Sequence, residues 1–173
     1  MKSLLILGAG GFGHMIKETA QALGYEEIVF LDDMVKEDDV IGMCCDYVIK
    51  HEEYPVAVAA FGNNKTRLFW TDKLLEEGYE VPAIVHPSAV VSPSVTLEPG
   101  CFIMQRSVVN TNTKIERAAL VYSGAVVDHN SVVCAGAHVG LGSVVKANCT
   151  IESGRKVEAG EVIFSTRRKI EGV

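Results

Sequence analysis

The chain has 173 residues, of which 48% are hydrophobic and 22% charged, so it has room for one domain or two small ones and is not expected to be disordered. Its formal charge of −6 at pH 7 disfavours nucleic-acid and anionic-membrane partners, because phosphate binding needs a basic face. No apolar run approaches the ~20 residues of a membrane span. Since the chain leads directly into a strand, we expect a cytoplasmic protein with no signal peptide and no membrane insertion.

The five cysteines match no recognisable motif. They are odd in number, form no C-x-x-C pair and mostly lie within apolar patterns: Cys44, Cys45, Cys101, Cys134 and Cys149. This usage is typical of small buried side chains in a reducing compartment. The histidines match no compact metal-ligand spacing, so no metal site is expected.

Residues 1–82 alternate strand and helix signals. Apolar runs predict strands at 3–8, 27–31 and 56–61, with a further short strand at 47–49. Helical spacing predicts helices at 12–23 and 65–77, each followed by a glycine that is typical of a helix end. This order of elements predicts a small α/β domain with a parallel sheet.

The first strand runs into LILGAGGFGH at 5–14, in which Gly8, Gly10 and Gly13 satisfy G-x-G-x-x-G. Taken alone, this motif and the later Asp32 indicate a dinucleotide site and therefore a dehydrogenase. However, only about 80 residues precede the next region, roughly half of a dinucleotide-binding fold, and they hold no second mononucleotide unit. The glycines are therefore expected to bind phosphate without forming a nicotinamide site.

From Val85 onward the period of the sequence changes. An aliphatic residue recurs at every sixth position, fourteen times in succession: Val85, Val91, Leu97, Ile103, Val109, Ile115, Val121, Val127, Val133, Val139, Val145, Ile151, Val157 and Ile163. A helix cannot place such a repeat on one face, whereas short strands joined by turns can. Residues 83–173 are therefore predicted to form a parallel β-solenoid. If three hexapeptides make one coil of roughly 18 residues, the repeats supply between four and five coils.

Several segments together resemble a known family. They follow in order along the chain: LILGAGGFGH, FLDD at 30–33, FGNNKTR at 61–67, HPSA at 86–89 and VYSGAVVDHNSVVCAGAHVGLGSVV at 121–145. Nearly the whole chain is similar to the sialic-acid O-acetyltransferase and bacillosamine-pathway N-acetyltransferase group. The resemblance implies a half-Rossmann-like α/β domain followed by a left-handed parallel β-helix, in a homotrimer with the active site between subunits. It also implies acetyl-CoA as co-substrate and a nucleotide-linked amino sugar or sialic acid as acceptor.

The resemblance makes His129 the candidate catalytic base, since it falls on the family's catalytic histidine and histidine titrates near neutral pH. The family often has an acidic residue next in the chain, where this sequence has Asn130. An amide can orient the ring but cannot stabilise imidazolium as a carboxylate does. Asp128 is a candidate source of that charge, although adjacent residues in a strand point to opposite faces.

The same resemblance assigns the acetyl-CoA contacts to His138 and to backbone amides in the segment from Gly142 to Ala147. The solenoid is shorter than is common in the family, which predicts weaker CoA binding. A basic tail then follows, with Arg167, Arg168 and Lys169. These side chains either attract the CoA phosphates or form an ordinary solvated end.

In the α/β domain, the resemblance implies a site for the uridine diphosphate part of an activated sugar. The candidate residues are the glycines after the first strand, the acids after the second and the polar residues after the last: Gly10, Gly11, Asp32, Asp33, Gly62, Asn63 and Arg67. Arg67 would bind phosphate, or else be an ordinary solvated helix arginine.

Three functions remain open from the sequence. The leading one is an acetyl-CoA-dependent N-acetyltransferase acting on a UDP-linked amino sugar in bacterial surface glycan biosynthesis. An O-acetyltransferase acting on sialic acid or another sugar hydroxyl is the nearest alternative, and Asn130 argues mildly against it because a hydroxyl needs stronger base assistance. A non-catalytic, nucleotide-binding trimeric scaffold is the third.

Overall fold

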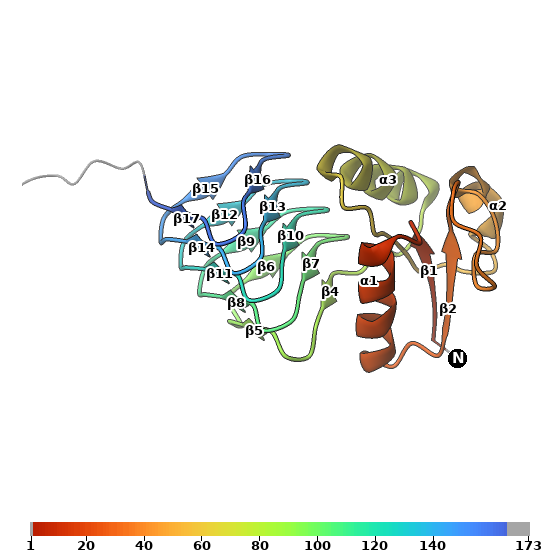
Figure 1. Ribbon diagram of the computed structural model, residues 1–173, viewed down its shortest axis with the longest axis horizontal. Helices are drawn as coiled ribbons and strands as arrows, with labels where there is room; N and C mark the ends of the chain where they lie inside the picture. Colours follow the sequence, from red (N-terminus) through yellow and green to blue (C-terminus); the bar gives the residue numbers. More distant parts are fainter. Residues whose placement is uncertain (1, 166–173) are drawn as a thin grey trace, which may run out of the picture.

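The computed structural model describes residues 2–165 and consists of an α/β domain followed by a β-solenoid (Figure 1). The expected contacts of Arg167, Arg168 and Lys169 lie outside the described residues. The domain has a parallel sheet with the strand order β2-β1-β3. Its elements are β1 (Ser3–Leu7), α1 (Gly11–Ala22), β2 (Glu27–Leu31), the 3-10 helix η1 (Cys44–Asp46), α2 (Tyr47–Lys50), β3 (Ala57–Ala59) and α3 (Asn64–Glu77).

The two faces of this sheet pack against different helices. Leu4 and Ile6 of β1 lie in a cluster with α1 and with the solenoid, whereas Leu5 and Leu7 lie in a cluster with α3. All four side chains have no solvent exposure, as expected for a parallel strand covered on both sides. The third glycine of the motif allows α1 to approach β1, because a Cβ on Gly13 would lie 2.0 Å from the carbonyl oxygen of Gly8.

The strand predicted at 47–49 is wrong, because these residues belong to α2. The preceding η1 turn is held by Asp46, whose carboxylate accepts a hydrogen bond from the backbone N–H of Met43 at 2.8 Å. Val48 and Ile49 are 49% and 75% exposed. An apolar triplet without a sheet neighbour therefore continues the helical turn.

The solenoid strands form three parallel sheets. The domain-facing sheet consists of β4 (Ile84–Val85), β7 (Phe102–Ile103), β10 (Leu120–Val121), β13 (His138–Val139) and β16 (Lys156–Val157). The valine sheet consists of β5 (Val90–Val91), β8 (Val108–Val109), β11 (Val126–Val127), β14 (Val144–Val145) and β17 (Val162–Ile163). The third sheet consists of β6 (Thr96–Leu97), β9 (Lys114–Ile115), β12 (Val132–Val133) and β15 (Thr150–Ile151).

The register confirms the predicted repeat. Leu120 pairs with Phe102 on one side and with His138 on the other, so each coil takes 18 residues. The second residue of each strand is the aliphatic of the six-residue period, and these residues form the solenoid core. The first residue points outward. The prediction of an α/β domain followed by a parallel β-solenoid is therefore confirmed.

Three corners join the sheets, and each turns through a residue with positive φ. These residues recur every six positions: Gly100, Arg106, Asn112, Ala118, Gly124, Asn130, Gly136, Gly142, Asn148, Gly154 and Gly160. The left-handed conformation favours glycine and is tolerated by asparagine, which explains most of this set.

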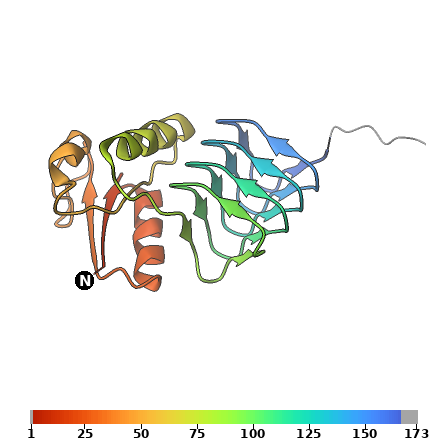
Figure 2. The same ribbon diagram turned by 180° about the vertical axis from the view of Figure 1, so that it is seen from behind.

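The α/β domain contacts one side of the solenoid (Figure 2). The outward residues Ile84, Phe102 and Leu120 of the domain-facing sheet share a buried cluster with Ile16 of α1. Further along the same row the outward residues become polar, with His138 and Lys156. The boundary between the two units is therefore apolar at its first coils and polar at its last ones.

Candidate functional site

The glycine motif and the acids after β2 meet in one cavity. This cavity measures ≈ 510 Å³ and is lined by five of the seven residues expected to bind the nucleotide: Gly10, Gly11, Asp32, Asp33 and Gly62. Phe12 and Phe61 also line it. It lies at the carboxyl ends of the parallel strands, where ligands bind in open α/β sheets.

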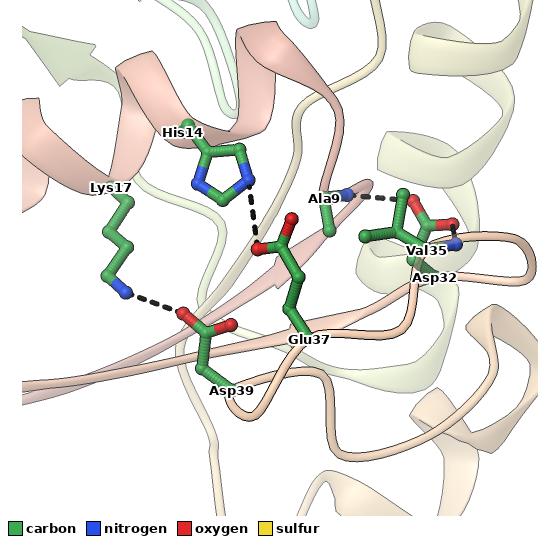
Figure 3. Close-up of polar contacts among 7 residues, drawn as sticks. All are labelled: Ala9, His14, Lys17, Asp32, Val35, Glu37 and Asp39. Carbon is green, nitrogen blue, oxygen red and sulfur yellow. Dashed lines mark hydrogen bonds and ion pairs between the residues drawn. The ribbon is translucent and has the colours of Figure 1, made fainter.

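Asp32 organises the wall of this nucleotide cavity. Its carboxylate accepts hydrogen bonds from the backbone N–H groups of Ala9, Met34 and Val35, each at 2.8 Å. Burial raises the pKa of Asp32, but the three backbone hydrogen bonds outweigh that effect and lower it. The charged carboxylate thus ties the glycine loop to the turn after β2 (Figure 3).

Two side-chain contacts attach the loop after β2 to helix α1. His14 Nε2 lies 3.3 Å from a carboxylate oxygen of Glu37, and Lys17 Nζ lies 2.5 Å from Asp39 (Figure 3). The hydrogen bond from Lys17 is the main reason why the pKa of Asp39 is lowered. One side of the nucleotide cavity is therefore held to the helix that follows the glycine motif.

The structure gives Arg67 a different role from the predicted phosphate contact. Its side chain has no solvent exposure and does not line the nucleotide cavity. Its guanidinium donates to backbone carbonyl oxygens, among them those of Phe61 at 3.0 Å and Ala118 at 2.8 Å. Asn63 also has a structural contact, because its side chain caps α3 by accepting from the N–H of Thr66 at 3.0 Å.

Asn63 does line a second cavity, of ≈ 400 Å³, which lies beside the first one. Gly62 lines both. The second cavity is bordered by Lys65 of α3 and by Lys156 of the solenoid. It therefore lies between the α/β domain and the last coils of the domain-facing sheet.

His129 lies at the corner between the valine sheet and the third sheet. The side-chain amide nitrogen of Asn130 lies 2.9 Å from Nδ1 of the ring. Asp128 does not bond to the ring: its carboxylate accepts from the backbone N–H of His129 at 2.8 Å and from the side chain of Asn110 at 3.0 Å. These two hydrogen bonds lower the pKa of Asp128. Its charge is therefore near the histidine, while Asn130 orients the ring.

A neighbouring asparagine contacts the oxygen of the Asn130 amide. Nδ2 of Asn112, one coil earlier, donates to Oδ1 of Asn130 at 3.4 Å. The amide NH₂ of Asn130 therefore faces Nδ1 of His129. In a neutral ring, a nitrogen that accepts from an amide leaves the proton on the other nitrogen, so this arrangement favours the Nε2–H tautomer.

His138 lies on the outward face of the domain-facing sheet, in a third cavity of ≈ 250 Å³ lined also by Tyr122, Lys156 and Glu158. Its Nδ1 is buried without a hydrogen-bond partner among the described residues. Burial, followed by the charges of Arg67 and Lys156, lowers the pKa of His138 to about 4, against a smaller opposing effect of Glu158. The ring is therefore neutral at pH 7, and its unpartnered nitrogen is a place for a water or a polar ligand group.

The expected cofactor residues do not converge within one chain. The N–H of Gly142 donates to the carbonyl oxygen of Ser123 at 3.1 Å, so it is not available to a pantetheine arm as predicted. Ala147 lies on the His129 corner, one coil later, where the N–H of the next residue bonds to the carbonyl oxygen of His129. His129 and His138 are separated by the third sheet, and no described cavity contains both.

Tyr122, Phe12 and Lys156 were not singled out from the sequence. The ring centroids of Phe12 and Tyr122 are 6.0 Å apart, and those of Tyr122 and His138 are 5.5 Å apart. These contacts join the nucleotide cavity to the His138 cavity. The 18-residue register was the available signal for Lys156, because it places this residue directly beside His138.

Among residues 2–165, no three His, Cys, Asp or Glu side chains gather in a metal-binding cluster. The helices there are too short or too polar to cross a membrane.

Comparisons with known proteins agree with this architecture. Residues 3–74 match the family model of the PglD N-terminal domain. The acetyltransferase domain of PglB from Neisseria gonorrhoeae FA1090, whose structure is also known in complex with acetyl coenzyme A, is 30% identical with a TM-score of 0.73, and the match covers 95% of this chain and 92% of that one. PerB from Caulobacter crescentus, in complex with CoA and GDP-perosamine, is 29% identical with a TM-score of 0.81, and the match covers 95% and 89%. The chain therefore belongs to the PglD-type hexapeptide-repeat sugar acetyltransferases.

Proposed function

We propose that this acetyltransferase transfers the acetyl group of acetyl-CoA to the amine of a nucleotide-linked amino sugar, with UDP as the nucleotide, in bacterial surface glycan biosynthesis. The observation that carries the proposal is a series of three cavities. The nucleotide cavity shares Gly62 with the second cavity, which shares Lys156 with the His138 cavity. A nucleotide bound at the glycine loop would thus extend its sugar toward the solenoid.

The glycine loop supports the nucleotide end of this assignment. It precedes α1, whose first N–H groups have no partner within the helix and attract an anion. A Cβ added to Gly10 or Gly11 would meet no other atom within 4 Å, so the space beside this backbone is open to a diphosphate. Asp33 also lines the cavity; its Oδ1 accepts the backbone N–H of Cys44 at 2.8 Å, and its other carboxylate oxygen would serve the ribose or base.

The transfer itself needs a base. The amine nitrogen forms a bond to the acetyl carbon while the carbon–sulfur bond breaks, the nitrogen loses a proton to His129, and the imidazolium then gives this proton to the departing thiolate of CoA. A neutral imidazole suits this task at pH 7. Asp128 supports it by placing a negative charge beside the ring.

The Asn130 amide sets a condition on this step. His129 accepts a proton at Nε2 when its ring proton is on Nδ1, a tautomer that an acceptor facing Nδ1 stabilises. The observed orientation of Asn130 presents its NH₂ group there. A rotated amide would favour the base at Nε2, and an aspartate at this position would accept the Nδ1 proton directly.

A homotrimer with the active site between subunits would complete the site. The outward residues of the valine sheet are all valine: Val90, Val108, Val126, Val144 and Val162. The first and last are 62% and 41% exposed, and an exposed apolar row of this kind favours burial against another surface. It borders the His129 corner, so a second copy packed there would supply the groups that one chain does not bring to His129.

The cell compartment is also part of the proposal. All five cysteines are free, which suits a reducing cytoplasm.

The decisive experiment measures thiol release from acetyl-CoA with a panel of UDP- and GDP-linked amino sugars, sialic acid and neutral sugars. We expect release only with amino sugars, and mass spectrometry should find a gain of one acetyl group on nitrogen. Release with hydroxyl acceptors alone would make the protein an O-acetyltransferase. No release, together with no calorimetric binding of acetyl-CoA at high micromolar concentration, would favour the scaffold.

A further inference from the structure

Helix α3 follows the solenoid corner between the third sheet and the domain-facing sheet. The corner residues it crosses lie one coil apart and share positive φ: Gly100, Ala118, Gly136 and Gly154. Asn64, Arg67 and Thr71 lie on one stripe of the helix. The amide of Asn64 donates to the carbonyl oxygen of Gly154 at 3.0 Å, and a Cβ on Gly100 would lie 2.9 Å from Thr71. The two ends of this stripe thus contact the two ends of the corner row.

The spacing of the two structures explains this contact. An α-helix rises about 5.4 Å per turn, and neighbouring parallel strands lie about 4.8 Å apart. The seven residues from Asn64 to Thr71 therefore rise about 10.5 Å, whereas the three coils from Gly154 to Gly100 span about 14 Å. The helix lies close to all four corners because the corner residues are small, and the Asn64 and Arg67 side chains span the remaining distance.

Arg67 occupies the middle of this contact. Its Nε donates to the carbonyl oxygen of Ala118 at 2.8 Å and its Nη2 to that of Gly136 at 3.0 Å. Burial lowers the pKa of Arg67 to about 10, so the group stays charged at pH 7. None of the ion pairs among residues 2–165 includes it. The buried charge is satisfied by backbone oxygens and by the side chain of Asn64.

The carbonyl groups that Arg67 holds belong to two functional regions. Nη1 donates to the carbonyl oxygen of Phe61, which lines the nucleotide cavity. Nη2 reaches the carbonyl oxygens of Gly136 and, at 3.5 Å, Ala137, the two residues before His138. One planar group thereby joins a wall of the nucleotide cavity to the coil that carries His138.

An arginine is an unusual choice for attachment alone. Burying a charge costs free energy, and well-packed apolar side chains often hold two surfaces together at least as well. What the guanidinium adds is direction, because its five N–H donors lie in one rigid plane. This property matters where the distance between two regions must be fixed.

We propose that Arg67 is a positioning residue for acetyl transfer, which fixes the nucleotide cavity relative to the His138 coil. The inference rests on the proposed function. A nucleotide would bind normally to a protein with a loosened Arg67 contact, but its sugar would reach the reacting groups in a less favourable position. A displacement of about 1 Å can reduce the rate on the order of 100-fold.

The test compares Arg67→Lys, Arg67→Met and the control Asp72→Asn. Arg67→Lys keeps the charge but loses the planar group, and Arg67→Met removes both. Asp72 lies on α3 and pairs with the exposed Arg117 at 2.7 Å, so Asp72→Asn weakens the same interface without touching Phe61 or the His138 coil. The readouts are calorimetric Kd values for UDP and GDP, kcat with the acceptor from the panel, and an NMR titration of His138.

We expect Arg67→Lys to fold, to bind the nucleotide within about threefold of the original affinity, and to lose kcat on the order of 10- to 100-fold. Asp72→Asn should change neither the nucleotide Kd nor kcat by more than about twofold, as is usual for an exposed pair. In Arg67→Met the pKa of His138 should rise, because one of the two cations that lower it is gone while Lys156 and Glu158 remain. If Arg67→Met does not fold, the kcat and nucleotide Kd of Arg67→Lys alone test the proposal.

Three outcomes would overturn the inference. An unchanged kcat in Arg67→Lys would show that the fixed distance is not needed. Equal losses in Arg67→Lys and Asp72→Asn would show general attachment only. A large rise in the nucleotide Kd of Arg67→Lys with unchanged kcat would indicate that Arg67 binds phosphate, as the sequence predicted. If the original protein transfers no acetyl group, the proposed function fails, and an unchanged His138 titration in Arg67→Met would separately refute the placement of Arg67.

Discussion

Two corners of the solenoid have the same backbone conformation but different side chains. The corner that α3 crosses, here called the covered corner, has Gly100, Ala118, Gly136 and Gly154 at its positive-φ positions, and the His129 corner has Asn112, Asn130 and Asn148. At Gly100 and Gly136 of the covered corner a larger residue would collide with the helix, as the 3.2 Å approach of a Gly136 Cβ to Leu68 shows. At the His129 corner no helix among residues 2–165 crosses the solenoid, and the asparagines bond to one another and to His129.

The inward aliphatic residues and the positive-φ residues give every corner the same backbone conformation. The outward side chains therefore determine what each corner contacts. Small residues make one corner a docking edge for the α/β domain. Polar residues keep the other corner free for chemistry and, in the proposed trimer, for a neighbouring subunit. The following predictions test this distinction, from the largest expected effect to the smallest.

His129→Ala should separate chemistry from stability at the His129 corner. Because general acid–base catalysis typically contributes about 10²- to 10⁴-fold, we expect kcat to fall by at least 100-fold in the thiol-release assay. Thermal unfolding and the calorimetric Kd for UDP should not change, since the side chain is not part of the core or of the nucleotide cavity. Unchanged turnover would remove His129 from the mechanism.

Gly136→Ala should show the opposite behaviour at the covered corner, with Gly154→Ala as its control. Both substitutions put an alanine at positive φ, at a cost of about 1–2 kcal/mol each. A Cβ at Gly154 has no neighbour within 4 Å, whereas one at Gly136 meets Leu68. Gly136→Ala should therefore lose about 1 kcal/mol more in urea unfolding. Equal losses would mean that α3 does not press on this corner.

Asn130→Asp should make His129 a better base. The carboxylate accepts the Nδ1 proton and stabilises the imidazolium, so we expect kcat/KM to rise several-fold and the acid limb of the pH–rate profile to move to higher pH. NMR of the ring nitrogens should show the Nδ1–H tautomer in the variant and the Nε2–H tautomer in the original protein.

Asn148→Asp is the matched control for that prediction, because it adds the same charge one coil away at another positive-φ position. It should leave the tautomer unchanged. If both variants shift the tautomer equally, the effect comes from charge alone and not from the Asn112–Asn130 hydrogen bond.

His138→Asn should change the pH dependence of stability. The pKa of His138 is about 4 in the folded protein and near 6.5 in an unfolded chain. The neutral buried ring therefore contributes stability that is complete above about pH 6.5 and is lost as the pH falls from there toward 4. The free energy of unfolding should decrease more steeply over this range in the original protein than in His138→Asn. Parallel curves would contradict the lowered pKa.

Much of the fold could be predicted from the sequence because its signals are local and repeated. The six-residue period fixed the inward residues of every solenoid strand, and the glycine motif located the first turn of the α/β domain. The segment at 47–49 shows where such local signals fail. An apolar triplet predicts a strand, and the sequence does not show that no neighbouring strand is available to pair with it.

The candidate site was less predictable because its contacts join distant parts of the chain. The motif residues Gly10 and Asp32 could be grouped from their spacing. Arg67 could not be assigned, because its partners at 118 and 136 follow from the packing of two units, and from sequence a buried arginine looks like a phosphate ligand. The tautomer of His129 likewise depends on Asn112, one coil away.

Helix α3 is shorter than the corner row it contacts. From Asn64 to Thr71 the helix rises about 10.5 Å, whereas Gly154 and Gly100 are three coils, or about 14 Å, apart, so side chains span the difference of about 4 Å. The helix begins at Asn64, and its contact with the corner row therefore ends at Gly154. Coils added beyond that point would lengthen the solenoid without moving the α/β domain, so the size of the coenzyme-binding wall can change independently of the nucleotide cavity.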